Sequence, residues 1–169
     1  GNFLVIAYRE LRRLELEVLH RLYVRVASSR TLDVKSLVFV DVDQFYGIEI
    51  EEFPAQIAQV ALWLTDHQMN LKVQHFGLYY KRIPLVKKAN IVCANALRLD
   101  WNMVVSAKEL SFILGNPPFV GAKYMDDVQR ADVAVVFGSM KNAGLLDFVA
   151  AWYVKAAKMM QGTPIRCAF

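Results

Sequence analysis

The segment Leu110-Ser111-Phe112-Ile113-Leu114-Gly115-Asn116-Pro117-Pro118-Phe119 gives the strongest indication of the fold of this chain. Its mostly apolar first half predicts a strand, and the glycine and the two prolines predict that the strand stops at Gly115. Proline has no N–H and favours an extended residue before it, so the turn should expose free carbonyl acceptors. In open α/β folds, ligands bind at the carboxyl ends of the strands. The segment therefore predicts an α/β fold with a ligand site at this turn.

The chemistry of the turn suits a planar ring that carries an exocyclic amino group. The Asn116 side chain and the Pro117 carbonyl can accept N–H groups, and Phe119 offers a flat face for stacking. An unpaired adenine or cytosine fits this description. The alternative is that Asn-Pro-Pro only starts a loop, because such dipeptides mark turns in many proteins.

Residues 112–119 closely resemble the catalytic motif of amino-methylating, S-adenosylmethionine-dependent DNA methyltransferases. Three further segments follow the order of that family along the chain, namely 1–3, 45–50 and 90–97. A longer pattern resembles the narrower group of MmeI-like fused restriction-modification enzymes; it comprises residues 46–50, 61–70, 95–101 and 146–153. The resemblance implies a doubly wound, Rossmann-like α/β methyltransferase core with a mostly parallel sheet. Residues 1–169 would form one partial domain of this kind, truncated at both ends.

Gly1-Asn2-Phe3 resembles the end of the family's glycine-rich motif, which holds the methionine part of the cofactor S-adenosylmethionine. Ordinary helix capping explains the Gly-Asn pair equally well. Apolar residues recur at spacings of three and four from Leu4 to Leu22, which predicts an amphipathic helix. The charged residues, Arg12 among them, lie mainly on its other side.

A second cofactor contact is expected where the β-prone run 45–50 ends. In Rossmann-like folds a carboxylate at such a strand end accepts hydrogen bonds from both ribose hydroxyls, and Glu49 is the candidate, with Ile50 beside it. Alternatively, Glu49, Glu51 and Glu52 only complement the dipole of the helix that Pro54 begins.

The third segment places a polar residue just beyond the apolar run that starts at Asn90. Many family members have an acid here, which accepts a hydrogen bond from the amino group of the cofactor's adenine. This chain has Asn95, whose amide oxygen can accept the same bond without charge assistance. Asp100 could be the acid instead, and the spacing leaves both open.

The resemblance implies methyl transfer to the exocyclic amino group of adenine in DNA. Asn116 and Pro117 would accept the two N–H bonds of that group, and Phe119 would stack on the extruded base. Pro118, Lys123 and Tyr124 are expected to contact DNA, and the glycine-bounded segment 121–144 is expected to be a mobile, substrate-facing loop.

Three other functions remain open: amino-methylation of cytosine, methylation of a protein glutamine, and a non-catalytic fragment. In the family, a strand and an acidic, glycine-rich stretch precede the position of Gly1. We therefore expect the isolated chain to bind the cofactor weakly and to be inactive, and we expect target-recognition and possibly nuclease domains in the parent chain.

Composition agrees with a single domain or a part of one. The 169 residues are 56% hydrophobic and carry a net charge of +4, with neither a membrane-spanning run nor a signal peptide, so a cytoplasmic protein is expected. Cys93 and Cys167 lack metal-ligand spacing and are expected to be buried thiols, with no metal site. The run 71–90 combines lysines and an arginine with aromatic residues, which is typical of a DNA surface or of a solvated connection. A largely apolar, buried helix is predicted over residues 145–160.

Overall fold

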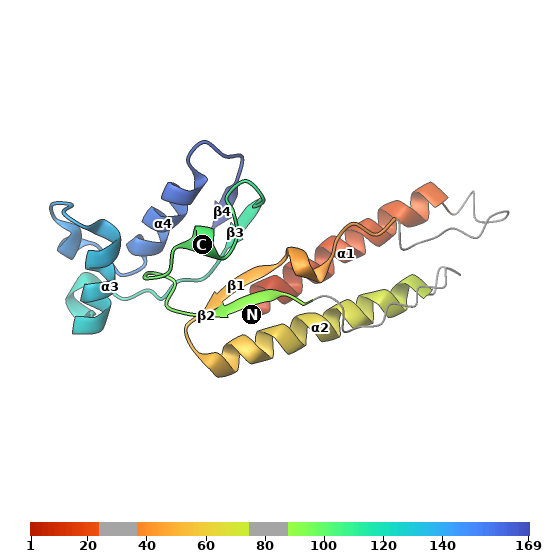
Figure 1. The fold of residues 1–169 in the computed structure, drawn as a ribbon, viewed down its shortest axis with the longest axis horizontal. Helices are drawn as coiled ribbons and strands as arrows, with labels where there is room; N and C mark the ends of the chain where they lie inside the picture. The colour runs from red at the N-terminus through yellow and green to blue at the C-terminus, as the bar shows by residue number, and fades with distance from the viewer. Residues whose placement is uncertain (24–36, 75–87) are drawn as a thin grey trace. The chain divides into compact units, whose positions relative to one another are not determined.

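The computed structural model describes residues 1–23, 37–74 and 88–169, which form two compact units. Unit 1 comprises Gly1–Cys93 and unit 2 comprises Ala94–Phe169, and each is described by itself. Figure 1 labels the helices and strands along the chain. Most of the basic and aromatic run 71–90, typical of either a DNA surface or a solvated connection, lies outside the described residues.

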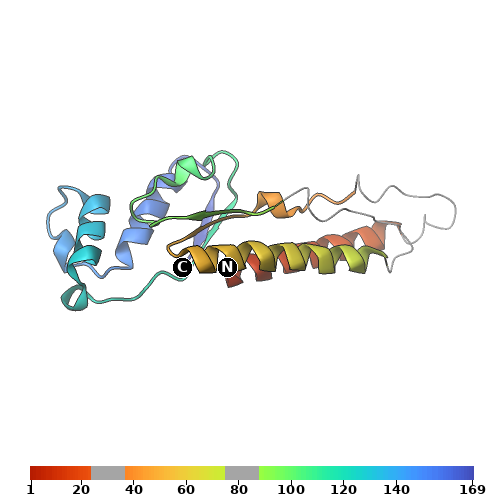
Figure 2. The same ribbon diagram turned by 60° about the horizontal axis from the view of Figure 1, so that its bottom comes forward.

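Unit 1 consists of two long helices and a pair of parallel strands (Figures 1 and 2). Its elements are α1 (Asn2–Tyr23), a short 3-10 helix η2 (Val42–Gln44), β1 (Tyr46–Glu49), α2 (Glu52–Gln74) and β2 (Asn90–Cys93). The strands are in parallel register from Tyr46 opposite Asn90 to Glu49 opposite Cys93, so both end at the same edge. Their core is apolar and includes Tyr8, Leu16, Val42, Leu62, Met69 and Ala89.

The buried face of α1 differs from the one that its apolar spacing predicted. Tyr8, Arg12 and Leu16 are buried, whereas the apolar side chains at 11, 14, 18 and 22 are exposed. Arg12 is fully buried because its guanidinium donates to Glu15 at 2.8 Å and to Asn70 of α2 at 2.8 Å. The Tyr8 hydroxyl donates to Asp66 at 2.6 Å. Polar partners on α2 therefore determine which face of α1 is covered.

Unit 2 contains a second pair of parallel strands and two short helices. Its elements are η3 (Trp101–Met103), β3 (Phe112–Leu114), η4 (Ala122–Tyr124), α3 (Asp127–Phe137), η5 (Ala143–Leu145), α4 (Ala150–Met160) and β4 (Arg166–Ala168). β3 pairs in parallel with β4, from Phe112 opposite Arg166 to Leu114 opposite Ala168. The core of this unit includes Leu97, Met125, Val133, Val136, Phe137, Phe148 and Ala151.

Two predictions about unit 2 were wrong. The segment 121–144 is not a loop, because Asp126 and Gln129 form a capping box that starts α3. The helix predicted over 145–160 begins only at Ala150. The Asp147 carboxylate instead accepts a hydrogen bond from the Ala122 N–H at 2.9 Å, which keeps residues 146–149 outside the helix.

The pairing of both strand pairs agrees with an α/β fold, and strands are present in the β-prone run 45–50, in the apolar run that starts at Asn90 and in the segment that stops at Gly115. Cys93 is exposed and Cys167 half-buried, so the prediction of buried thiols was wrong for Cys93, which lies at the open end of β2. No helix within the described ranges is both long enough and apolar enough to cross a membrane.

Candidate active site

The turn after β3 presents its polar and aromatic groups to solvent. Asn116 is exposed, Pro117 is buried, and the Phe119 ring is 74% exposed. Among the described residues, no hydrogen bond uses the Asn116 side chain or the Pro117 carbonyl. The turn thus offers two acceptors and one open aromatic face.

Both ends of this turn are anchored within unit 2. At the start, the Gly115 N–H donates to the Ala168 carbonyl at 3.1 Å, and the Phe169 ring packs against Gly115. A Cβ atom at position 115 would lie only 3.1 Å from that ring, which is why glycine fits here. At the other end, the Phe148 N–H donates to the Val120 carbonyl at 2.9 Å. The four residues between these anchors have a fixed entry and a fixed exit.

The residues predicted to contact DNA follow directly. Pro118 is exposed, and Lys123 and Tyr124 are exposed residues of η4, with the Tyr124 side chain 85% exposed. The Tyr124 N–H donates to the Gly121 carbonyl at 2.8 Å, which closes this short helix. A cationic and an aromatic side chain are therefore accessible near the turn in the sequence.

In unit 1, the structure brings Gly1 and Glu49 together. Glu49 is the last residue of β1, and its Oε1 lies 2.6 Å from the Gly1 backbone nitrogen. A Cβ atom at position 1 would approach Ala58 Cβ to 2.8 Å, so only glycine lets the chain pass this close to α2. Asn2 and Phe3 are exposed in the first turn of α1, and Ile50 is exposed just after β1.

This geometry passes a simple test for the cofactor that the sequence implies. A carboxylate at the carboxyl end of a parallel strand can accept two hydroxyl hydrogen bonds. Glu49 therefore fits the ribose portion of such a molecule.

Asn95 lies in a tightly bonded turn at the start of unit 2. Its Oδ1 accepts from the Leu97 N–H at 2.9 Å, and its Nδ2 donates to Asp132 at 2.8 Å. Asp100, the other candidate, is exposed and caps η3 by accepting from the Asn102 N–H at 3.0 Å. Both side chains have acceptor oxygens, but Asn95 is held at both ends of its amide, whereas Asp100 is an exposed cap.

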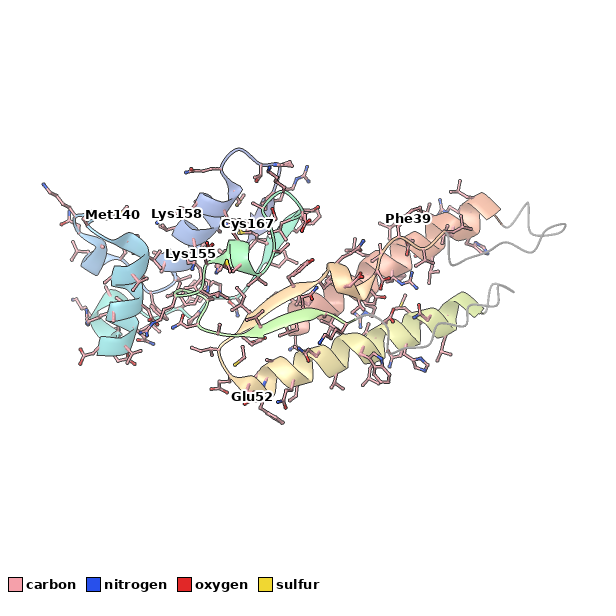
Figure 3. All side chains as sticks on the ribbon, viewed as in Figure 1. Phe39, Glu52, Met140, Lys155, Lys158 and Cys167 are labelled. Atoms are coloured by element: carbon pink, nitrogen blue, oxygen red, sulfur yellow. The ribbon has the colours of Figure 1, made fainter. Side chains whose placement is uncertain are left out.

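Sequence reasoning missed Asp132 and Lys155, which both support the Asn95 turn. Asp132 lies on α3, and Lys155 projects from α4 (Figure 3). The Lys155 ammonium donates to the carbonyls of Leu97, at 3.1 Å, and Leu99. Burial lowers the pKa of Lys155, and the nearby Asp100 carboxylate acts in the opposite direction. A lone acid in the apolar run 131–137 was the available sequence signal for Asp132, because a buried charge requires partners.

Comparison with known proteins shows close similarity over the whole chain. Residues 1–169 match the family model described as MmeI, DNA-methyltransferase domain. DNA methyltransferase A of Bacillus subtilis (strain 168) is 39% identical over 173 residues, which cover all of this chain and 19% of that protein. The solved structure of the Type IIL restriction-modification enzyme MmeI in complex with DNA is 58% identical, with a TM-score of 0.90, over 99% of this chain and 22% of that one. The chain thus spans about a fifth of the length of these relatives.

Proposed function

Because the chain belongs to the family of MmeI DNA-methyltransferase domains, we propose that it supplies the methyl-transfer site of a DNA methyltransferase that modifies the exocyclic amino group of adenine. The relatives are about five times longer, so the activity is proposed for the full-length protein that contains this chain. Restriction-modification is the proposed setting, with target-recognition domains and possibly a nuclease in the same protein.

The observation that carries this proposal is the Asn116-Pro117-Pro118-Phe119 turn at the carboxyl end of β3, in which Asn116, Pro118 and Phe119 are exposed. The lone pair of an adenine amino nitrogen is delocalised into the ring, so the nitrogen is a poor nucleophile. Asn116 Oδ1 and the Pro117 carbonyl would accept its two N–H bonds and favour a pyramidal nitrogen with an available lone pair. These acceptors gain strength as positive charge develops on the nitrogen, which is the type of interaction that accelerates a reaction.

Phe119 would hold the target base. An amino group inside a base pair cannot reach such a turn, so the base must leave the duplex and stack against an aromatic ring. The largely exposed Phe119 ring has a free face for this purpose. Pro118, Lys123 and Tyr124 would contact the neighbouring DNA, with Lys123 near a phosphate.

The proposed cofactor is S-adenosylmethionine, which supplies an activated methyl group when bound. Glu49 would accept hydrogen bonds from its ribose hydroxyls, and Ile50 would contact its adenosine part. Gly1, Asn2 and Phe3 would hold its methionine part, and Asn95 would accept the amino group of its adenine. The position of the Glu49 carboxylate at the carboxyl end of β1 supports its assignment to the ribose.

Product analysis tests the proposal. The purified full-length protein would be incubated with duplex DNA and S-adenosylmethionine carrying an isotopically labelled methyl group, and the DNA would be digested to nucleosides for mass spectrometry. We expect labelled N6-methyladenine. Labelled N4-methylcytosine would show that cytosine, not adenine, is the target base. Label on a protein glutamine would show that the substrate is protein and not DNA. The absence of label from DNA and protein would contradict an active enzyme.

A further inference from the structure

The side chain of Asp132 is a buried carboxylate that faces the predicted adenine-binding residue. Asp132 is 4% exposed although it lies in the middle of α3. Its Oδ2 accepts from Asn95 Nδ2 at 2.8 Å, and its Oδ1 accepts from Arg98 Nε at 2.6 Å. Each oxygen thus has one donor, and the Arg98 charge compensates the buried carboxylate.

These contacts allow only one orientation of the Asn95 amide. The Leu97 N–H can only donate, and the ionised Asp132 carboxylate can only accept, so the amide oxygen must face Leu97 and the nitrogen must face Asp132. The amide oxygen has a second lone pair beyond the one that Leu97 uses. A hydrogen bond from the amide to a carboxylate also polarises the amide, which makes its oxygen a stronger acceptor.

The backbone around Asn95 is held from a second side. The Lys155 ammonium binds the carbonyls of Leu97 and Leu99 and lies 5.5 Å from the centre of the Trp101 ring. The Trp101 indole N–H donates to the Ala96 carbonyl at 2.8 Å. Asp132 of α3 thus holds the Asn95 side chain, and Lys155 of α4 holds the backbone that follows it.

We propose that Asp132 is a positioning residue for the cofactor, which orients and polarises Asn95 so that the amide oxygen accepts the amino group of the cofactor's adenine. This inference rests on the proposed function. An acid at position 95 would bring its negative charge directly to the adenine amino group, whereas Asp132 brings its charge through the hydrogen bond to Asn95. This hydrogen bond favours Asn95 over Asp100 as the residue that contacts the adenine.

The test uses two ligands that differ at the amino-bearing edge of the purine. S-adenosylhomocysteine has the amino group there, and S-inosylhomocysteine has a carbonyl oxygen in its place and a hydrogen on the neighbouring ring nitrogen. In the full-length protein, calorimetry should show about tenfold tighter binding of the adenosyl ligand, the ratio expected from about one net hydrogen bond. In Asp132→Asn, the amide oxygen at position 132 stays with Arg98, and its nitrogen faces the nitrogen of Asn95. Asn95 then loses the acceptor that fixes and polarises its amide, so the preference between the two ligands should shrink or disappear.

An exchange of the two side chains should restore the preference. In the double variant Asn95→Asp/Asp132→Asn, the amide at position 132 can keep its oxygen toward Arg98 and donate its N–H to the carboxylate at position 95. Every hydrogen bond remains, with one reversed in direction, and a carboxylate now faces the adenine. We expect the adenosyl preference to return at least to the wild-type ratio.

Asp126→Asn is the matched control, because Asp126 is also an acid of α3 and caps its first turn. It should leave the ligand preference unchanged even if the melting temperature falls. Equal losses for both ligands in Asp132→Asn, or no loss, would overturn the role of Asp132. If this variant does not fold, the double variant decides, and its failure to prefer the adenosyl ligand overturns the proposal. Wild-type protein that binds both ligands equally refutes only this inference, whereas protein that binds neither also refutes the proposed cofactor.

Discussion

At the scale of single residues, different residues of the turn after β3 have structural and chemical roles. Pro117 is buried and fixes the path of the chain, whereas Asn116 and Phe119 on either side of it are exposed. Because the large aromatic ring of Phe119 is mostly exposed, it contributes little to the folding stability of unit 2. The turn therefore matches a ligand site better than a simple connection.

Replacement of Asn116 by alanine should slow methyl transfer in the full-length protein by about a hundredfold or more, as expected for the loss of one preorganised transition-state hydrogen bond. The affinity for S-adenosylmethionine should hardly change. Single-turnover methylation measures the first quantity and calorimetry the second. Gln161→Ala, which removes an exposed amide after α4, is the control and should leave both unchanged. An Asn116→Ala rate within a few fold of wild type would contradict the catalytic role.

Phe119→Ala should weaken binding of the target base by about 1–3 kcal/mol, whereas Phe119→Tyr and Phe119→Trp should retain most of it. Fluorescence of DNA with 2-aminopurine at the target position should rise on binding as the base leaves the stack, and it should rise less with the alanine variant. Since the ring is exposed, the melting temperature should stay near that of wild type. A large drop in melting temperature with normal fluorescence would show that Phe119 is a packing residue.

Glu49→Ala should raise the dissociation constant for S-adenosylmethionine about thirtyfold, which corresponds to about 2 kcal/mol for hydrogen bonds to a charged group. The rate of methyl transfer at saturating cofactor should change much less. Glu51→Ala is the matched control, because Glu51 is an exposed acid two residues further on. Equal effects of the two substitutions would support the view that these acids only complement the dipole of α2.

At the scale of elements, α1 and α2 are joined through a buried polar network around Arg12. Glu15, which accepts from Arg12, also accepts from the N–H groups of Phe39, at 2.6 Å, and Val40, at 3.0 Å. Burial, and next the hydrogen bond to Asp66, raise the pKa of Tyr8 far above its usual range, so its hydroxyl stays protonated and donates. The network thus connects both helices to the chain segment that leads into β1.

Arg12→Ala should destabilise the α1–α2 pair by about 3–5 kcal/mol, because it leaves Glu15 and Asn70 buried without their donor. Hydrogen exchange of the α1 and α2 amides in the full-length protein should become markedly faster. Arg13→Ala is the control: Arg13 is exposed and, among the described residues, forms an ion pair with Glu10 on the surface of the same helix. Similar exchange in the two variants would show that the buried network is dispensable.

Local patterns in the sequence predicted the strands well and the helix boundaries less well. The apolar run that ends at Gly115 located β3 to within two residues, because turn chemistry is local. The burial of Arg12 depends on Asn70, which only the folded chain brings near. The late start of α4 likewise depends on the contact between Asp147 and Ala122. The capping box at Asp126 was a local signal that the sequence reading overlooked.

At the scale of the whole molecule, the residues predicted to bind the cofactor and the substrate occur in both units. Gly1 and Glu49, which were predicted separately, meet in unit 1, and the turn 116–119 and Asn95 belong to unit 2. The expected roles of these residues came from the resemblance of their sequence motifs to those of DNA methyltransferases. The supporting contacts of Asp132 and Lys155 could not be inferred from it, since they depend on how α3 and α4 pack within unit 2. The basic run 71–90 lies mostly outside the described residues, so its two interpretations, a DNA surface and a solvated connection, are not tested.

The pairing of β3 with β4 also orders events during synthesis on the ribosome. Gly115 obtains its hydrogen bond from Ala168 and its neighbouring ring from Phe169, which are translated long after the motif itself. At about 5–20 residues per second, several seconds separate the two strands. The turn 116–119 is therefore among the last parts of this chain to acquire its geometry. A nascent chain halted before Arg166 would contain all four residues of the motif but neither of the contacts that fix where the turn begins.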